Sequence, residues 1–228
     1  MLRFQPSALR PFLARALTRP LDGLVRRRVN PNLITTLGVF VNLAAGLAYF
    51  LDSLQLGGAL ILLGGVMDIV DGHVARATGR TTRFGSFYDS TTDRLAEVFV
   101  FLGVMSLYLG DSPNIGEPWM VYVVVAALAG SLMVSYTRAK AEALGIDCKV
   151  GLMQRAERII LLGGSTLIFG SWRHGMVLSW VMVAMAALTN LTALYRIYWV
   201  WSYLRRQPEA GNPSAPAQAA RVPEPLKR

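Results

Sequence analysis

Six long apolar runs constrain this chain more than any other feature of its sequence. The runs cover approximately residues 32–52, 55–79, 86–109, 117–143, 156–172 and 175–203. A helix needs about 20 apolar residues to cross the hydrocarbon core of a bilayer, so each run is close to the length of one span. The chain is 53% hydrophobic and only 16% charged, which is unlike a soluble domain. We therefore predict an all-α integral membrane protein with six transmembrane helices.

The basic residues predict how these helices are oriented. Lys and Arg are concentrated at the N-terminal end, between the second and third runs, between the fourth and fifth runs, and after residue 204, whereas the other connections hold only Arg173. Basic loops remain in the cytoplasm, so this alternation predicts a multi-pass protein of the cell membrane with both termini and one polar face in the cytoplasm. Because the net charge of +9 lies at the helix ends, it favours lipid headgroups or a phosphorylated substrate as the anionic partner, and not nucleic acid.

The two ends of the chain differ from the apolar middle. Leucine and other apolar residues recur at helical spacing over residues 7–28, with arginines between them, which predicts an amphipathic helix in the membrane surface. The last residues are rich in Pro and Ala and have no periodicity, which is typical of a disordered cytoplasmic tail. We therefore expect an amphipathic juxtamembrane helix over 1–30, a membrane domain over 31–205 and a disordered tail over 206–228.

Four aspartates stand where the second and third runs meet. Asp68 and Asp71 are three residues apart, and Asp89 and Asp93 are four apart, so each pair lies on one face of its helix. A short loop joins the two helices, which makes them antiparallel neighbours and brings the pairs together near the cytoplasmic boundary. Four facing carboxylates do not all stay ionised without a cation. Mg²⁺ or Mn²⁺ suits such oxygen ligands, and the four side chains have enough oxygens for two ions with one carboxylate shared.

Two other interpretations of the aspartates remain open from the residues alone. Ionisable side chains inside membrane spans also build pathways for ions or protons. They also form structural salt bridges, for which Arg76, Arg83 and Arg94 are available. Small residues at Gly72, Ala75 and Gly85 leave the facing helix surfaces clear for close approach of another helix or of a ligand. Beside them, Arg76 and Thr82 are suited to bind phosphate oxygens.

The segment from Asp68 to Asp93 fits the pattern D-x2-D-G-x2-A-R-x8-G-x3-D-x3-D at every fixed position. In this pattern, and in its six predicted spans behind a surface helix, the chain resembles the CDP-alcohol phosphotransferase family. Members of that family move a substituted phosphate from a CDP-linked donor to an alcohol and release CMP. The resemblance implies an enzyme that uses CDP-diacylglycerol in phospholipid biosynthesis.

The resemblance also implies roles for individual residues. Asp68, Asp71, Asp89 and Asp93 would bind two Mg²⁺ or Mn²⁺ ions, and Asp93 would also be the general base for the acceptor hydroxyl. Gly72, Ala75 and Arg76 would line the nucleotide pocket, with Thr82 and Gly85 nearby. A Pro-Asn-x-x-Thr sequence opens the first span, so Asn32 and Thr35 would reach the nucleotide from the facing helix. The alternative for Asn32 is a helix cap after Pro31. Many members are homodimers, which we adopt as an expectation.

The acceptor alcohol is predicted from basic residues in the last three spans. Ser135, Arg138, Lys140, Arg158 and Arg196 resemble the corresponding residues of the branch that makes phosphatidylinositol phosphate. They would bind the phosphate of a phosphorylated polyol such as inositol 1-phosphate. Lys149 and Arg155 are interpreted as ordinary residues of a cytoplasmic loop, whereas Arg196 lies inside a span, where a charge is costly without a polar partner.

Two alternative functions remain. One is a phosphatidylglycerol phosphate synthase, which would use glycerol 3-phosphate as the acceptor. The other belongs to a different class, a cation carrier that uses the aspartates as its transport site. The acidic residues cluster at one membrane boundary beside basic residues, which favours the enzyme.

Overall fold

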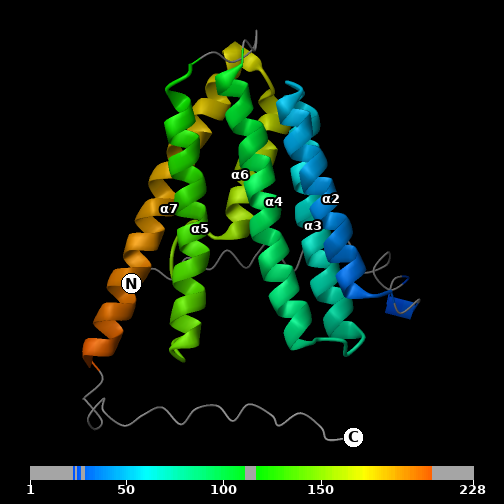
Figure 1. Ribbon diagram of the computed structural model, residues 1–228, viewed down its shortest axis with the longest axis vertical. Coiled ribbons are helices and arrows are strands. Elements are labelled where there is room, and N and C mark those ends of the chain that lie inside the picture. Colours follow the sequence, from blue (N-terminus) through cyan, green and yellow to red (C-terminus); the bar gives the residue numbers. More distant parts are fainter. Residues whose placement is uncertain (1–22, 24, 27–28, 111–116, 207–228) are drawn as a thin grey trace, which may run out of the picture.

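The computed structural model describes residues 23, 25–26, 29–110 and 117–206. These residues fold into six long helices (Figure 1), which are α2 (Pro31–Phe50), α3 (Leu54–Ala77), α4 (Arg83–Leu109), α5 (Met120–Ala143), α6 (Arg155–Phe169) and α7 (Trp172–Arg206). The predicted surface helix over 1–30 lies almost wholly outside the described residues, and the predicted tail lies outside them from residue 207 onward.

Local sequence signals explain where several helices begin. The Asn30 side chain accepts a hydrogen bond from the Asn32 amide, and Pro31 follows as the first residue of α2. Thr82 caps α4 in the same way, because its Oγ1 accepts from the amide of Gly85 at 2.9 Å. At the start of α7, Arg173, His174 and Gly175 have a left-handed backbone. They form a turn before the continuous helix.

Four of the six helices are long and apolar enough to cross a membrane, namely α2, α3, α5 and α7. The predicted apolar character of all six runs is therefore confirmed only in part. The two exceptions have physical reasons: α4 carries Asp89, Asp93, Arg94 and Glu97 within residues 89–97, and α6 has only 15 residues. All six helices nevertheless occupy the predicted segments to within a few residues at each end.

The helices form two groups that converge at one end of the bundle (Figure 1). In one group, α2 packs against both α3 and α4, and in the other α5 packs against α7. α6 contacts α3 and α7, so it joins the two groups. Its N-terminus lies about halfway along the bundle, and the end that carries the α3–α4 loop is the end where the groups separate (Figure 1).

Close backbone contact holds α2 against α4. A Cβ placed on Gly103 would lie 2.1 Å from the backbone oxygen of Gly46, so neither position has space for a side chain. Within lipid, helices associate through such packing and through hydrogen bonds between helices. Buried examples are the bonds from Tyr49 to Thr166, 2.7 Å between hydroxyl oxygens, and from Tyr108 to Ser179, 3.1 Å. These contacts fix the bundle at its converging end.

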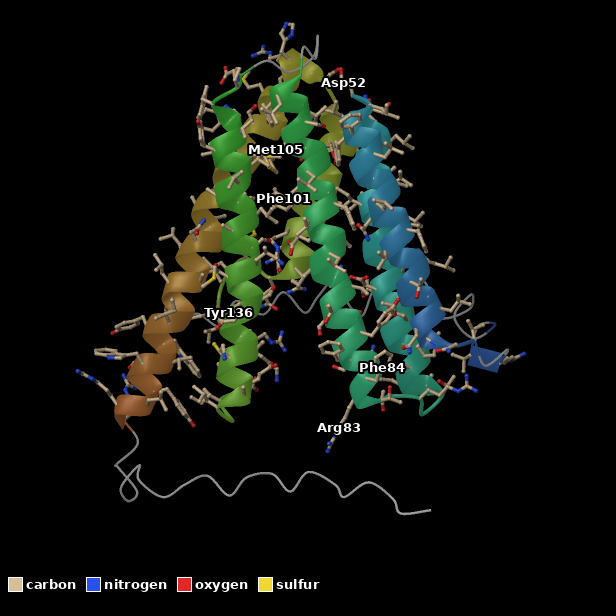
Figure 2. The ribbon with its side chains drawn as sticks, viewed as in Figure 1. Asp52, Arg83, Phe84, Phe101, Met105 and Tyr136 are labelled. Atoms are coloured by element: carbon tan, nitrogen blue, oxygen red, sulfur yellow. The ribbon has the colours of Figure 1, made fainter. Side chains whose placement is uncertain are left out.

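The two ends of the bundle differ in charge. Figure 2 shows Asp52 at the converging end, whereas Arg83 and Phe84 lie at the opposite end, where the Arg83 side chain points away from the helices. The α3–α4 loop and the ends of α5 and α7 share this second end (Figure 1). These are the segments rich in Lys and Arg.

Candidate active site

The last turns of α3 and the first turns of α4 bring the four aspartates together. Asp68 and Asp71 lie on α3, and Asp89 and Asp93 lie on α4. Asp89 is close enough to interact electrostatically with each of the other three. The short loop between antiparallel helices therefore produces one acidic cluster, which is partly shielded from solvent.

Arg155, the first residue of α6, lies between two of these aspartates. Its Nη2 is 2.9 Å from Oδ2 of Asp68 and 2.7 Å from Oδ1 of Asp93, and its Nε donates a hydrogen bond of 3.0 Å to Asp68. A third, longer ion pair of 3.6 Å joins Arg94 to Asp93. One guanidinium thus neutralises a carboxylate from each of the two helices. The interpretation of Arg155 as an ordinary loop residue is wrong, because its side chain reaches into the cluster.

This arrangement bears directly on metal binding. Among the described residues, no three His, Cys, Asp or Glu side chains are positioned to hold an ion together. The donor set nevertheless fits a hard divalent cation, since it consists of carboxylate oxygens, and the Arg155 guanidinium stands where positive charge is required. An ion can bind both Asp68 and Asp93 only after the Arg155 guanidinium moves away from their carboxylates.

The residues predicted to bind the donor lie around the aspartates on three helices. Thr35 on α2 donates a hydrogen bond from Oγ1 to Oδ2 of Asp71 at 2.7 Å, and both side chains are buried. Asn32, one turn earlier, faces Gly85 of α4, because a Cβ on Gly85 would lie 3.4 Å from Oδ1 of Asn32. The cap of α2 is Asn30, so the alternative in which Asn32 is the cap is wrong.

On α3, the absence of a side chain at Gly72 leaves space that the Arg76 side chain occupies. The guanidinium of Arg76 lies across Gly72, where an added Cβ would be 3.3 Å from Nη1. Arg76 is exposed, and Ala75 beside it is half-buried. Thr82 is exposed too, and its hydroxyl serves as the cap of α4. These positions form a surface at the α3–α4 end of the bundle.

The predicted acceptor residues fall into two sets. Arg158 and Arg196 are almost completely buried, with 3% and 2% exposure, and protein oxygens satisfy much of their charge. Arg196 donates from Nε to the carbonyl oxygen of Val150 at 2.8 Å and from Nη1 to that of Val134. These bonds supply the polar partners that a charge within a span requires, and they tie α7 to α5 and to the segment before α6.

The other set lies along α5 and is more exposed. Arg138 forms an ion pair of 2.8 Å with Glu142, and Lys140 lies 5.9 Å from the ring centre of Tyr136. Ser135 donates to the backbone oxygen of Ser131. Arg196 lies near enough to Arg138 and Arg158 for their charges to repel its own. This local excess of positive charge is suited to an anionic ligand.

Sequence reasoning missed two residues of this region, Arg155 and Glu97. Glu97 is one turn beyond Asp93 on α4, and its carboxylate contacts Arg158 and Ser131. The spacing Asp89, Asp93, Glu97 was available in the sequence as three acids on one helix face. No comparable local signal marked Arg155, because its partners are distant in the chain.

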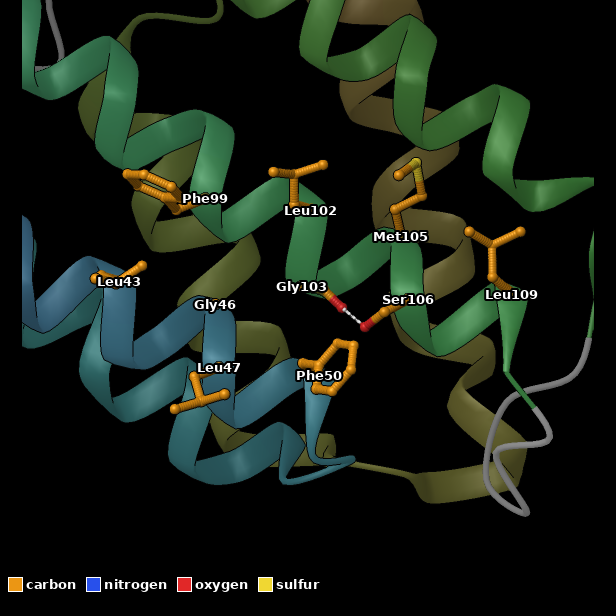
Figure 3. Close-up of a pocket in the computed structure, with 10 residues that line it drawn as sticks. All are labelled: Leu43, Gly46, Leu47, Phe50, Phe99, Leu102, Gly103, Met105, Ser106 and Leu109. Atoms are coloured by element: carbon orange, nitrogen blue, oxygen red, sulfur yellow. Dashed lines mark hydrogen bonds between the residues drawn. The ribbon is translucent and has the colours of Figure 1, made fainter.

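A hollow of about 330 Å³ lies elsewhere, between α2 and α4 (Figure 3). Leucine and phenylalanine side chains line most of it, and its one drawn hydrogen bond joins the Ser106 hydroxyl to the backbone oxygen of Gly103. Its lining includes no titratable side chain, so we exclude it as the place of chemistry.

The chain is similar to known proteins in both sequence and fold. The chain is 37% identical over 188 residues to the archaetidylinositol phosphate synthase of Methanothermobacter thermautotrophicus, which covers 82% of this chain and 91% of that protein. The crystal structure of Mycobacterium tuberculosis phosphatidylinositol phosphate synthase with CDP-DAG bound superposes with a TM-score of 0.73 and 28% identity, over 83% of this chain and 95% of that one. The same enzyme in complex with manganese and citrate gives 0.71 and 28%, over 81% and 88%. The family model described as CDP-alcohol phosphatidyltransferase matches residues 28–192, and the chain therefore belongs to this family.

Proposed function

We propose that this protein transfers the phosphatidyl group of CDP-diacylglycerol to inositol 1-phosphate and releases CMP. The observation that carries the proposal is the junction of α3, α4 and α6, where four aspartates meet the partly buried Arg155 and the buried Arg158. The aspartates are suited to an anionic donor that binds through divalent cations, and the arginines are suited to a phosphorylated acceptor. The names of the relatives support the same reaction.

The chain's own residues account for the transfer step. The acceptor hydroxyl oxygen bonds to the phosphorus that carries diacylglycerol, while the bond from this phosphorus to the CMP oxygen breaks. Asp93 takes the hydroxyl proton, and a positioned base contributes roughly 10²- to 10⁴-fold to such a step. Two divalent ions, held by Asp68, Asp71, Asp89 and Asp93, would supply the positive charge that neutralises the pyrophosphate and the departing CMP.

The remaining residues bind the two substrates. Asn32, Thr35, Gly72, Ala75, Arg76, Thr82 and Gly85 contact the cytidine diphosphate part of the donor. Ser135, Arg138, Lys140, Arg158 and Arg196 hold the acceptor phosphate. For Arg158 and Arg196 this contact is made by a guanidinium that the protein already fixes in place, which limits the loss of side-chain entropy on binding.

We also propose a topology in which all six helices lie in the membrane. The 15 residues of α6 extend only part of the way across the hydrocarbon core, and both termini and the active site face the cytoplasm. The location of the basic segments at the end marked by Arg83 supports this orientation. We also propose a homodimer with two ions in each subunit, to be checked by the mass of the purified protein in detergent.

The test is an acceptor panel with purified protein and Mn²⁺ or Mg²⁺. Inositol 1-phosphate, glycerol 3-phosphate and free inositol are offered separately with CDP-diacylglycerol or CDP-archaeol, and CMP and the lipid product are measured. We expect CMP release with inositol 1-phosphate, and none after chelation of the metal. Turnover with glycerol 3-phosphate alone would replace the proposal with phosphatidylglycerol phosphate synthesis. Cation movement into vesicles without CMP release would indicate a carrier.

A further inference from the structure

Glu97 is a charged residue in the bundle interior to which neither the motif nor the proposed reaction assigns a role. It lies on α4 one turn after Asp93, and its side chain is 11% exposed. One carboxylate oxygen, Oε1, is 3.0 Å from Nε of Arg158 and accepts a hydrogen bond of 2.6 Å from the Ser131 hydroxyl. The other, Oε2, is 3.9 Å from Nε of Arg94.

These contacts connect the proposed donor and acceptor sides of the site. Arg94 pairs with Asp93 on the same helix, whereas Arg158 belongs to α6 and Ser131 to α5. Arg158 also donates a hydrogen bond of 3.2 Å from Nη1 to the backbone oxygen of Met153. Glu97 is therefore the carboxylate that fixes the direction of the Arg158 guanidinium and offsets its charge.

We propose that Glu97 is a positioning residue for the acceptor phosphate and that it acts through Arg158. This inference rests on the proposed function, because it assumes that Arg158 binds that phosphate. Without the Glu97 charge, Arg158 is left among Arg94, Arg155 and Arg196, whose like charges repel it. The guanidinium then turns away from the geometry that receives the acceptor, while the donor residues on α2 and α3 are unaffected.

The test measures KM for each substrate separately in Glu97→Gln. Glutamine has the same shape and still accepts from Ser131, so only the charge is removed. Loss of a charge-assisted contact predicts a rise of about 10-fold or more in KM for inositol 1-phosphate. We expect KM for CDP-diacylglycerol to stay within about twofold, a split that a general structural defect would not produce. Glu117→Gln, which removes a carboxylate from an exposed pair with Trp119, is the matched control.

A double-mutant cycle with Arg158→Gln tests whether Glu97 acts through this arginine. If it does, adding Glu97→Gln to Arg158→Gln leaves KM for the acceptor unchanged. An equal loss in both backgrounds, or equal changes in both KM values, would overturn the inference. If Glu97→Gln does not fold, Ser131→Ala gives the same measurement, with an expected rise of about threefold in acceptor KM, and no rise would refute it. Failure of the wild-type protein to use inositol 1-phosphate would instead refute the proposed function.

Discussion

Replacing Arg155 with glutamine should make the protein bind divalent metal more tightly. The Arg155 guanidinium contacts Asp68 and Asp93 at 2.9 and 2.7 Å, so it competes with any ion that uses these carboxylates. Glutamine has no charge and leaves both carboxylates available. The metal affinity of the variant therefore shows whether Arg155 competes with the bound ion or stabilises it.

The size of the effect follows from how far the ion pairs are shielded. The three side chains are 23%, 25% and 14% exposed, so they resemble buried charged contacts more than surface pairs. Charged hydrogen bonds of this kind contribute about 1.5–3 kcal/mol, against about 0–1 kcal/mol for surface pairs. Taking about 2 kcal/mol for the contacts that an ion displaces, the affinity for metal should rise by about 30-fold.

The assay is a titration of the purified protein with Mn²⁺, in which electron paramagnetic resonance measures the free ion. Lys149→Gln is the matched control, because Lys149 loses the same charge but pairs with the exposed Asp147. Thermal unfolding with a chelator gives a second readout. The metal-free Arg155→Gln protein should unfold at a lower temperature than wild type, since four carboxylates then face one another without their guanidinium, and Mn²⁺ should raise that temperature more than it does for wild type.

Two results would refute the reasoning. If Mn²⁺ affinity in Arg155→Gln stays within a factor of about two of the control, the guanidinium does not compete with the ion. If the affinity of Arg155→Gln for Mn²⁺ falls, Arg155 stabilises the bound ion, and its contacts with Asp68 and Asp93 do not oppose metal binding.

Three further predictions concern catalysis and packing. Asp93→Asn should lower kcat by roughly 10²-fold or more, because the proposed base is lost, and a CMP-release assay with saturating substrates would show whether it does. Gly103→Val should prevent stable folding, since its Cβ alone would meet a backbone oxygen at 2.1 Å, whereas Gly164→Ala has open space and should be tolerated; size-exclusion chromatography in detergent distinguishes them. Tyr49→Phe removes the 2.7 Å bond to Thr166 and should cost about 1 kcal/mol of unfolding free energy, read from denaturation in mixed micelles, and unchanged stability would contradict it.

Helix positions and the acidic cluster were predictable because both depend on local sequence. Apolar runs of sufficient length predicted all six helices, and the spacings within 68–71 and 89–93 predicted that each aspartate pair shares a helix face. Two helices that are joined by only a few residues pack antiparallel to each other. That argument placed Asp68, Asp71, Asp89 and Asp93 together without any information about the other helices.

The partners of these aspartates were not predictable in the same way. Arg155 is 62 residues from Asp93 in the chain and 87 from Asp68, and its contact depends on where α6 begins within the bundle. Nothing local distinguishes it from Lys149, which remains in an exposed pair. Arg196 illustrates the same limit, because a charge within an apolar run indicates that a polar partner exists but not that two backbone carbonyls provide it.

The shortness of α6 has a consequence for how substrates arrive. At 1.5 Å per residue its 15 residues extend about 22 Å, less than the roughly 30 Å of the hydrocarbon core. In the proposed topology, Arg155 and Arg158 at its beginning are thus held below the level of the headgroups. A lipid-linked nucleotide reaches these arginines by lateral diffusion within one leaflet, and its hydrocarbon chains stay in the membrane core. In the proposed orientation, the water-soluble inositol phosphate has to descend from the cytosol to the same depth.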